Sequence, residues 1–138
     1  MIEINNLTTT LTVNEAFLKK ISLKILDEEK YKNKNLSIAL VGEQRIKRIN
    51  KKYRGKNRAT DVLAFPLKSS ECLGEIIICL REVKKNARKL QISFQEELIG
   101  VLIHGILHLL GYNHEKGNEL EAQKMKVKEQ YYYGQTKN

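Results

Sequence analysis

The chain has 138 residues, the length of one ordinary domain, and 41% of them are hydrophobic and 30% charged. With one proline, eight glycines and two cysteines, this composition excludes collagen-like, intrinsically disordered and disulfide-rich secreted proteins. Lysine and arginine number 25 against 16 acidic residues, and the resulting net charge of +9 favours a polyanionic partner.

The first half of the sequence predicts strands and helices in alternation. The segment Ile2–Leu7 is typical of an edge strand, and Asn14 is a suitable N-cap for a helix with apolar residues at every fourth position. Ile46, Ile49 and Tyr53 form the expected inward side of a second helix. That helix runs from Glu43 to about Lys52, and the strands beside it are Leu36–Val41, Asp61–Phe65 and Gly74–Leu80.

Every later segment has helical periodicity. The first predicted helix is Arg81–Leu90, with Val83, Ala87 and Leu90 buried. The second runs from the capping box of Ser93 and Glu96 to Leu110. The last runs from the capping box Asn118–Glu121 to the tyrosines at 131–133. The middle helix is apolar on nearly every side from Leu98 onward. Its apolar stretch of about 15 residues is too short to cross a bilayer, so we expect a buried helix.

This order of elements predicts an α+β (mixed α/β) fold in a single domain over residues 1–138. We expect a small four-stranded sheet covered by about five helices, with the helix that ends at Leu110 in the core. The N-terminus lacks the layout of a secretory signal, so the expected location is the cytoplasm, without a membrane.

All three histidines of the chain lie close together in sequence, at His104, His108 and His114. His104 and His108 are four residues apart on a predicted helix, so their rings share one face, and His114 follows the helix closely enough to fold back toward it. Three imidazoles leave a fourth coordination position open, as in catalytic zinc sites, so we expect one Zn²⁺ per chain. Nickel or copper also suits such a site, and zinc lowers the pKa of bound water toward about 7.

Two other interpretations of the histidines deserve comparison. A single histidine on an apolar helix is usually a core residue, but three would each need a separate buried partner, which favours a metal site. The spacing also matches zinc proteases with His-Glu-x-x-His-x-x-Gly-x-x-His, in which the glutamate is the general base. Gly105 replaces that glutamate here, so proteolysis is disfavoured.

A basic segment without any acidic residue lies between positions 45 and 58. Its predicted polyanion-binding residues are Arg45, Arg48 and Lys52, on one face of the second helix, and Lys56 and Arg58 in the loop that follows. A merely soluble helix normally mixes charges of both signs, so this segment indicates a polyanion bound with strong salt dependence. The tyrosines at 131–133 suit base stacking less well than docking of the last helix.

Four segments together resemble one family, the YbeY-type endoribonucleases, which are bacterial rRNA maturation factors. The segments are His104–His114, with a glycine after the first histidine, Tyr53–Lys56, Thr60–Pro66 and Leu73–Cys79. The resemblance covers about residues 36–130. Two positions depart from the family pattern: Ala64 stands where serine is common, and Glu75 where aspartate is usual.

The resemblance implies a zinc-dependent, single-strand-specific endoribonuclease that matures the 3′ end of small-subunit 16S rRNA in ribosome biogenesis and quality control. It implies that His104, His108 and His114 are the zinc ligands and that Arg54 has a functional role. It also implies cytoplasmic contact with RNA and the small ribosomal subunit, and no role for DNA.

The residues leave parts of the reaction open. Arg54 suits stabilisation of charge that develops on phosphorus, and the nucleophile is either water or the RNA 2′-hydroxyl. Glu115 is the nearest candidate general base, although a surface position is its more ordinary role. Two other functions fit the same features: a non-catalytic ribosome-assembly factor with a structural metal, and a zinc hydrolase of another substrate.

Overall fold

The computed structural model describes residues 1–8, 10–112 and 119–137, which form a four-stranded sheet with five helices. The elements are β1 (Ile2–Asn6), α1 (Glu15–Glu28), β2 (Asn35–Val41), α2 (Glu43–Arg54), β3 (Val62–Pro66), β4 (Cys72–Cys79), α3 (Leu80–Leu90), α4 (Phe94–Leu109) and α5 (Glu119–Gln135). The strand order is β1-β2-β4-β3, with β3 antiparallel to β4 and the other pairs parallel. The predicted α+β class and element order are confirmed.

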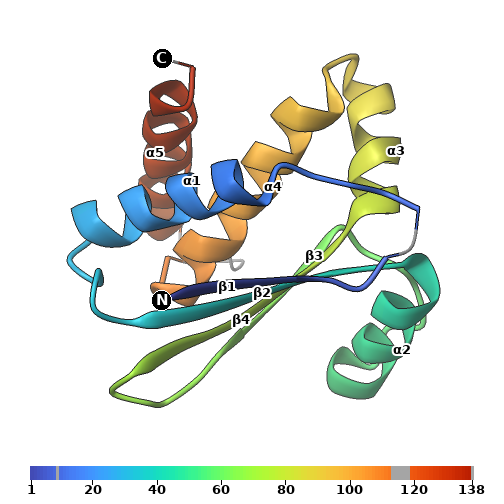
Figure 1. Cartoon of the computed structure of the whole chain (residues 1–138), viewed down its shortest axis with the longest axis horizontal. Helices are drawn as coiled ribbons and strands as arrows, with labels where there is room; N and C mark the ends of the chain where they lie inside the picture. The colour runs from blue at the N-terminus through green and yellow to red at the C-terminus, as the bar shows by residue number, and fades with distance from the viewer. Residues whose placement is uncertain (9, 113–118, 138) are drawn as a thin grey trace.

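Side chains alternate across the sheet, so an apolar core lies on each of its faces. The larger core joins the sheet to α1, α3, α4 and α5, and its strand residues include Leu36, Ile38, Leu40, Ile76 and Ile78. The smaller core lies against α2 and contains Ala39, Val41, Ile46, Leu63, Ile77 and Cys79. Figure 1 shows α2 below the sheet and the other four helices above it. The sheet therefore separates α2 from α4.

The helix caps follow the sequence closely where the structure describes them. The Asn14 side chain accepts a hydrogen bond from the Phe17 amide at the start of α1. Ser93 and Glu96 form the predicted capping box of α4. The other predicted box begins at Asn118, which lies outside the described residues.

Tyr53 does not face inward as predicted. Ile46 is fully buried in the smaller core, but the Tyr53 side chain is 62% exposed. Its ring meets the ring of Phe65, which belongs to the edge strand β3. The last turn of α2 thus reaches the border of the sheet, where no further strand among the described elements covers the tyrosine.

Leu90 is also exposed, at 61%, although the periodicity of α3 predicts a buried position. The helix ends at this residue, Gln91 adopts a left-handed conformation, and α4 departs at 116° to α3. The end of α3 therefore lies away from the sheet (Figure 1). No single helix among the described residues is long and apolar enough to cross a membrane, and α3 and α4 reach that length only as this bent pair.

The β3–β4 hairpin depends on Gly74, which pairs with Pro66. Its φ of +142° is unfavourable for other residues, and a Cβ atom there would lie 2.2 Å from the Phe65 carbonyl oxygen. Only glycine allows the two strands to approach this closely. The hairpin in turn places β3 beneath α4.

We expect Gly74→Ala to lower the free energy of unfolding by at least about 2 kcal/mol, because the new methyl group meets backbone atoms that have no room to move. Gly100→Ala in α4 is the matched control. A Cβ atom at Gly100 has no neighbour within 4 Å, so this variant should gain roughly 0.5–1 kcal/mol of helix propensity. Urea denaturation measures both, and equal midpoints for the two variants would contradict the expectation.

Candidate active site

The site is built on α4, which is buried except along one narrow stripe. From Glu97 to the end of the helix, only Glu97, Gly100, His104 and His108 are partly exposed, and they are spaced by three or four residues. Positions at this spacing lie on one helix face. His104 and His108 therefore share one face of α4, the face that stays accessible from Glu97 to the end of the helix.

Gly105 faces the opposite way, toward the sheet. A Cβ atom there would lie 3.0 Å from Cγ2 of Ile76 and 3.4 Å from Cγ2 of Val62. A glutamate at this position would be forced into the apolar core rather than toward the histidine face. The packing of α4 thus gives a physical reason why the zinc-protease glutamate is absent, and it adds to the argument against proteolysis.

Glu129 of α5 holds the ring of His104. Its Oε2 lies 3.0 Å from His104 Nδ1, and both side chains are only partly exposed. A carboxylate oxygen accepts a hydrogen bond, so Nδ1 carries a proton, and in the neutral imidazole Nε2 is then the nitrogen with the lone pair. Histidines that bind metals commonly make this contact to a carboxylate. Glu129 lies in a segment rich in lysine and glutamate, and no sequence pattern identified it.

His108 has a similar but longer contact to the main chain. Its Nδ1 lies 3.4 Å from the carbonyl oxygen of Tyr112, just after the end of α4. Because a carbonyl can only accept, this contact also favours Nε2 as the nitrogen with the lone pair. In both rings Nε2 is therefore available to donate an electron pair to a metal. Histidine ligands of zinc are neutral imidazoles of this kind, oriented by a hydrogen bond from the other ring nitrogen.

The third predicted ligand, His114, and the candidate base Glu115 both lie outside the described residues. Within the part of the chain that the structure describes, no three His, Cys, Asp or Glu side chains form a cluster that could hold a metal. Among the described residues, the structural support for a metal site therefore comes from His104 and His108 and from the groups that orient their rings.

A groove of about 350 Å³ runs beside His104. It is lined by Asp61, Val62, Glu97, Gly100, Val101, His104 and Glu129. The Asn86 amide donates to Asp61 Oδ2 at 3.3 Å. Burial and then the charge of Asp61 raise the pKa of Glu97, although a hydrogen bond from Asn86 works against the shift. A carboxyl group with a raised pKa beside this groove suits proton transfer.

The two carboxylates were not among the predicted site residues, although both left a signal in the sequence. Asp61 lies in the Thr60–Pro66 segment that carries the family resemblance. Glu97 lies seven residues before His104, a spacing that returns to the same helix face after two turns. The available clues were thus the family resemblance for Asp61 and the helical spacing from His104 for Glu97.

The basic segment, residues 45–58, lies on α2 and the loop that follows. All eight of its basic side chains are exposed: Arg45, Lys47, Arg48, Lys51, Lys52, Arg54, Lys56 and Arg58. Among the described residues, none of the eight forms an ion pair within 4 Å. Arg54 is the last residue of α2 and does not line the groove beside His104. The structure therefore brings the two histidines together but leaves Arg54 apart from that groove.

The loop after α2 is held by two local features. Gly55 adopts a left-handed conformation, with φ of +69°, and ends the helix. Asn50 is buried, and its side-chain amide donates to the Arg58 carbonyl oxygen at 2.9 Å. The loop that carries Lys56 and Arg58 is therefore tied to α2 rather than extended into solvent.

Glu29, just after α1, joins three parts of the molecule. Tyr112 Oη donates to its carboxylate at 2.7 Å and Lys128 Nζ at 2.9 Å, and Tyr132 Oη donates as well. Burial of Glu29 opposes ionisation, but hydrogen bonds from Tyr132, Lys128 and Tyr112 outweigh it, so the pKa of Glu29 lies below its usual value. This carboxylate fixes α5, and hence Glu129, relative to the end of α4.

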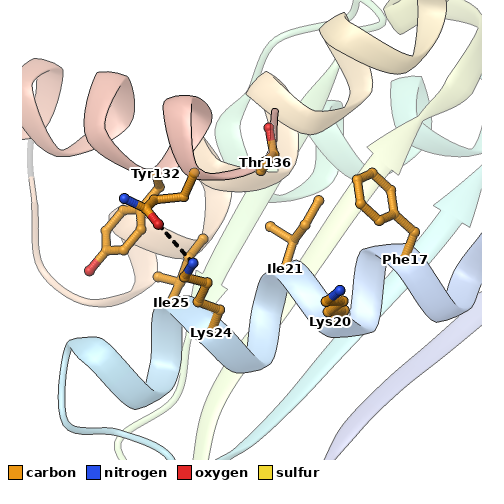
Figure 2. Close-up of a pocket in the computed structure, with 8 residues that line it drawn as sticks. Phe17, Lys20, Ile21, Lys24, Ile25, Tyr132 and Thr136 are labelled. Atoms are coloured by element: carbon orange, nitrogen blue, oxygen red, sulfur yellow. Dashed lines mark hydrogen bonds between the residues drawn. The ribbon is translucent and has the colours of Figure 1, made fainter. Parts of the chain in front are cut away.

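A second cavity, of about 160 Å³, lies between α1 and α5. Figure 2 shows Phe17, Ile21 and Ile25 of α1 on one side of it and Tyr132 of α5 on the other, and Lys24 Nζ donates to Gln135 Oε1 at 2.8 Å. None of the predicted site residues lines this cavity. We interpret it as a gap in the packing of two helices.

Comparisons with known proteins agree with the resemblance seen in the sequence. The family model described as endoribonuclease YbeY matches residues 3–137. A protein of that name from Sulfurihydrogenibium is 42% identical over 84% of this chain and 80% of its own length. One from Syntrophotalea carbinolica is 32% identical over 94% and 91%. A solution structure of a Thermotoga maritima protein, 34% identical, covers 99% of this chain and 89% of its own, with a TM-score of 0.70.

We expect Glu29→Gln to lower the free energy of unfolding by about 1–3 kcal/mol at pH 7, because a neutral amide is a weaker acceptor for three donors. The pKa of Glu29 is depressed in the folded state. The stabilisation from ionised Glu29 is therefore complete above the pKa of about 4.3 that the group has in the unfolded chain. It is lost as the pH falls through the lower pKa of the folded state. The difference from wild type should shrink below about pH 4.

Urea denaturation at a series of pH values measures this difference. Glu28→Gln is the matched control, because Glu28 is an exposed neighbour that, among the described residues, accepts a hydrogen bond from Tyr131 alone. It should change stability by less than about 0.5 kcal/mol. If Glu29→Gln lowered the free energy of unfolding by the same amount at every pH, the negative charge of Glu29 would not be the stabilising feature.

Proposed function

This chain belongs to the endoribonuclease YbeY family, and we propose that it is a zinc-dependent, single-strand-specific enzyme that matures the 3′ end of small-subunit 16S rRNA. Family membership makes it a hydrolase of RNA phosphodiester bonds. The proposal adds the metal, the unpaired substrate and the small ribosomal subunit as a partner in ribosome biogenesis and quality control, in the cytoplasm.

The orientation of His104 carries the proposal. Its ring is held by Glu129 at the edge of a groove that also contains Asp61 and Glu97. We propose that His104, His108 and His114 hold one Zn²⁺. When bound, the metal would supply Lewis-acid chemistry for phosphodiester cleavage.

The chain's own residues divide the remaining work. Glu129 and the Tyr112 carbonyl orient the two histidine rings, since each contacts a ring Nδ1. Glu97, whose pKa is raised chiefly by burial, holds or accepts a proton in the groove. Arg54 presents a planar set of donors that stabilises charge on a phosphate.

The basic segment binds the RNA backbone in this proposal. Its exposed side chains are spread along α2 and the following loop, so Arg45, Arg48, Lys52, Lys56 and Arg58 contact successive phosphates without reading bases. Such contacts give binding that weakens steeply with salt. The affinity for RNA then comes mainly from the face of the sheet that carries α2.

Cleavage of a single-stranded 16S rRNA 3′-end fragment by highly purified protein tests the proposal. Wild type should cut, and His108→Ala and Arg54→Ala should each lose at least about 100-fold in rate, since each removes a group that stabilises developing charge. Only His108→Ala should also lose zinc, as measured by elemental analysis.

Three outcomes would contradict this function. Equal cutting by all three proteins would assign the activity to a contaminant. Tight RNA binding without cutting by wild type would favour an assembly factor, and cleavage of peptides would favour a hydrolase of another substrate.

The role of Glu129 is tested by metal affinity alone. We expect Glu129→Gln to bind zinc about 10- to 100-fold more weakly, because the neutral amide holds the imidazole less firmly. Competition with a chromogenic chelator measures the affinity, and Glu28→Gln, which changes an exposed carboxylate that contacts Tyr131, should match wild type. If Glu129→Gln bound zinc as tightly as wild type, the proposed role of the Glu129 carboxylate in the metal site would be wrong.

A further inference from the structure

Tyr53 is an exposed aromatic residue in the middle of the basic segment. Its side chain is 62% exposed, and its ring meets the ring of Phe65 at 5.5 Å between centroids with an interplanar angle of 65°. An edge-to-face contact of this kind fixes a ring without covering both of its faces. Tyr53 is therefore held in place while part of its ring remains open to solvent.

The charges around Tyr53 suit a nucleic acid. Lys52 Nζ lies 5.2 Å from the centroid of the Tyr53 ring, and Arg54 is the next residue along the chain. The eight basic side chains of the segment are all exposed. A backbone-binding surface with an aromatic ring set into it is the arrangement by which proteins bind single strands.

The edge strand β3 connects Tyr53 to the groove beside His104. Phe65 packs on the α2 side of the sheet, whereas Val62 of the same strand lines the groove on the α4 side. The two residues are three positions apart along the strand, a distance of about 10 Å. β3 is the last strand of the described sheet, so its outer edge is a path between the two faces.

We propose that Tyr53, supported by Phe65, is a stacking platform for an unpaired base of single-stranded RNA whose backbone lies on the basic segment. The inference rests on the proposed function and deepens it. A base in the interior of a duplex is already covered on both faces by its neighbours, so the platform accepts an unpaired base in preference to a base of the duplex interior. Tyr53 thereby favours single strands over duplexes.

Fluorescence anisotropy with a labelled single-stranded RNA tests the platform. The full chain carries His108→Ala throughout to prevent cutting, and Tyr53→Ala, Tyr53→Phe, Tyr131→Ala and Lys47→Ala are added one at a time. Tyr131 is the control tyrosine, 46% exposed on α5, and Lys47 is an exposed cation of α2. Each protein is also measured with a duplex RNA and across a salt series.

We expect Tyr53→Ala to weaken binding to the single strand by about 5- to 150-fold, the loss of one stacked base, with an unchanged salt slope. Binding to the duplex should not change, and Tyr53→Phe and Tyr131→Ala should bind like their parent. Lys47→Ala should instead reduce the salt slope by about 0.7.

Single-strand binding by Tyr53→Ala equal to that of the parent would overturn the platform and leave the proposed function standing. Tyr53→Phe as weak as Tyr53→Ala would also overturn it, because the hydroxyl rather than the ring would be responsible. Absence of RNA binding by every protein, together with absence of cleavage by wild type, would overturn the proposed function itself.

Discussion

The close approach of α4 to the sheet at Gly105 is the constraint on which the site depends. A Cβ atom there would lie 3.0 Å from Cγ2 of Ile76 in the sheet, so even a methyl group requires that side chain to shift by a few tenths of an ångström. With that face of α4 against the strands, the stripe of Glu97, His104 and His108 is left as the accessible side. The same contact therefore turns the histidines outward and excludes a glutamate beside them.

Two carboxylates then set the position of α5 against this helix. Glu29 accepts hydrogen bonds from Tyr112, Lys128 and Tyr132, which come from the end of α4 and from α5. Glu129, one residue after Lys128, reaches His104. The orientation of a ring on α4 thus depends on a charge beside α1, since both contacts share α5.

The sheet separates the groove beside His104 from the basic segment. The groove with His104, Asp61 and Glu97 is on the face covered by α4, and the basic segment is on the face covered by α2. β3, at the sheet's edge, contributes Val62 to one side and Phe65 to the other. In the proposed RNA path the RNA strand passes this edge, and the position of β3 depends on the Gly74 hairpin.

The sequence by itself determined the element order, the caps at Asn14 and Ser93, the shared face of His104 and His108, and the family. These features depend on contacts within one or two helical turns or on local motifs, so periodicity and spacing are sufficient to predict them. Only the tertiary structure decided that Tyr53 is exposed and that Glu129 holds His104. Both depend on contacts between elements that are far apart in sequence. The edge strand β3 has no further strand in the described sheet to cover the Tyr53 ring, and α5 supplies the carboxylate that contacts His104 on α4.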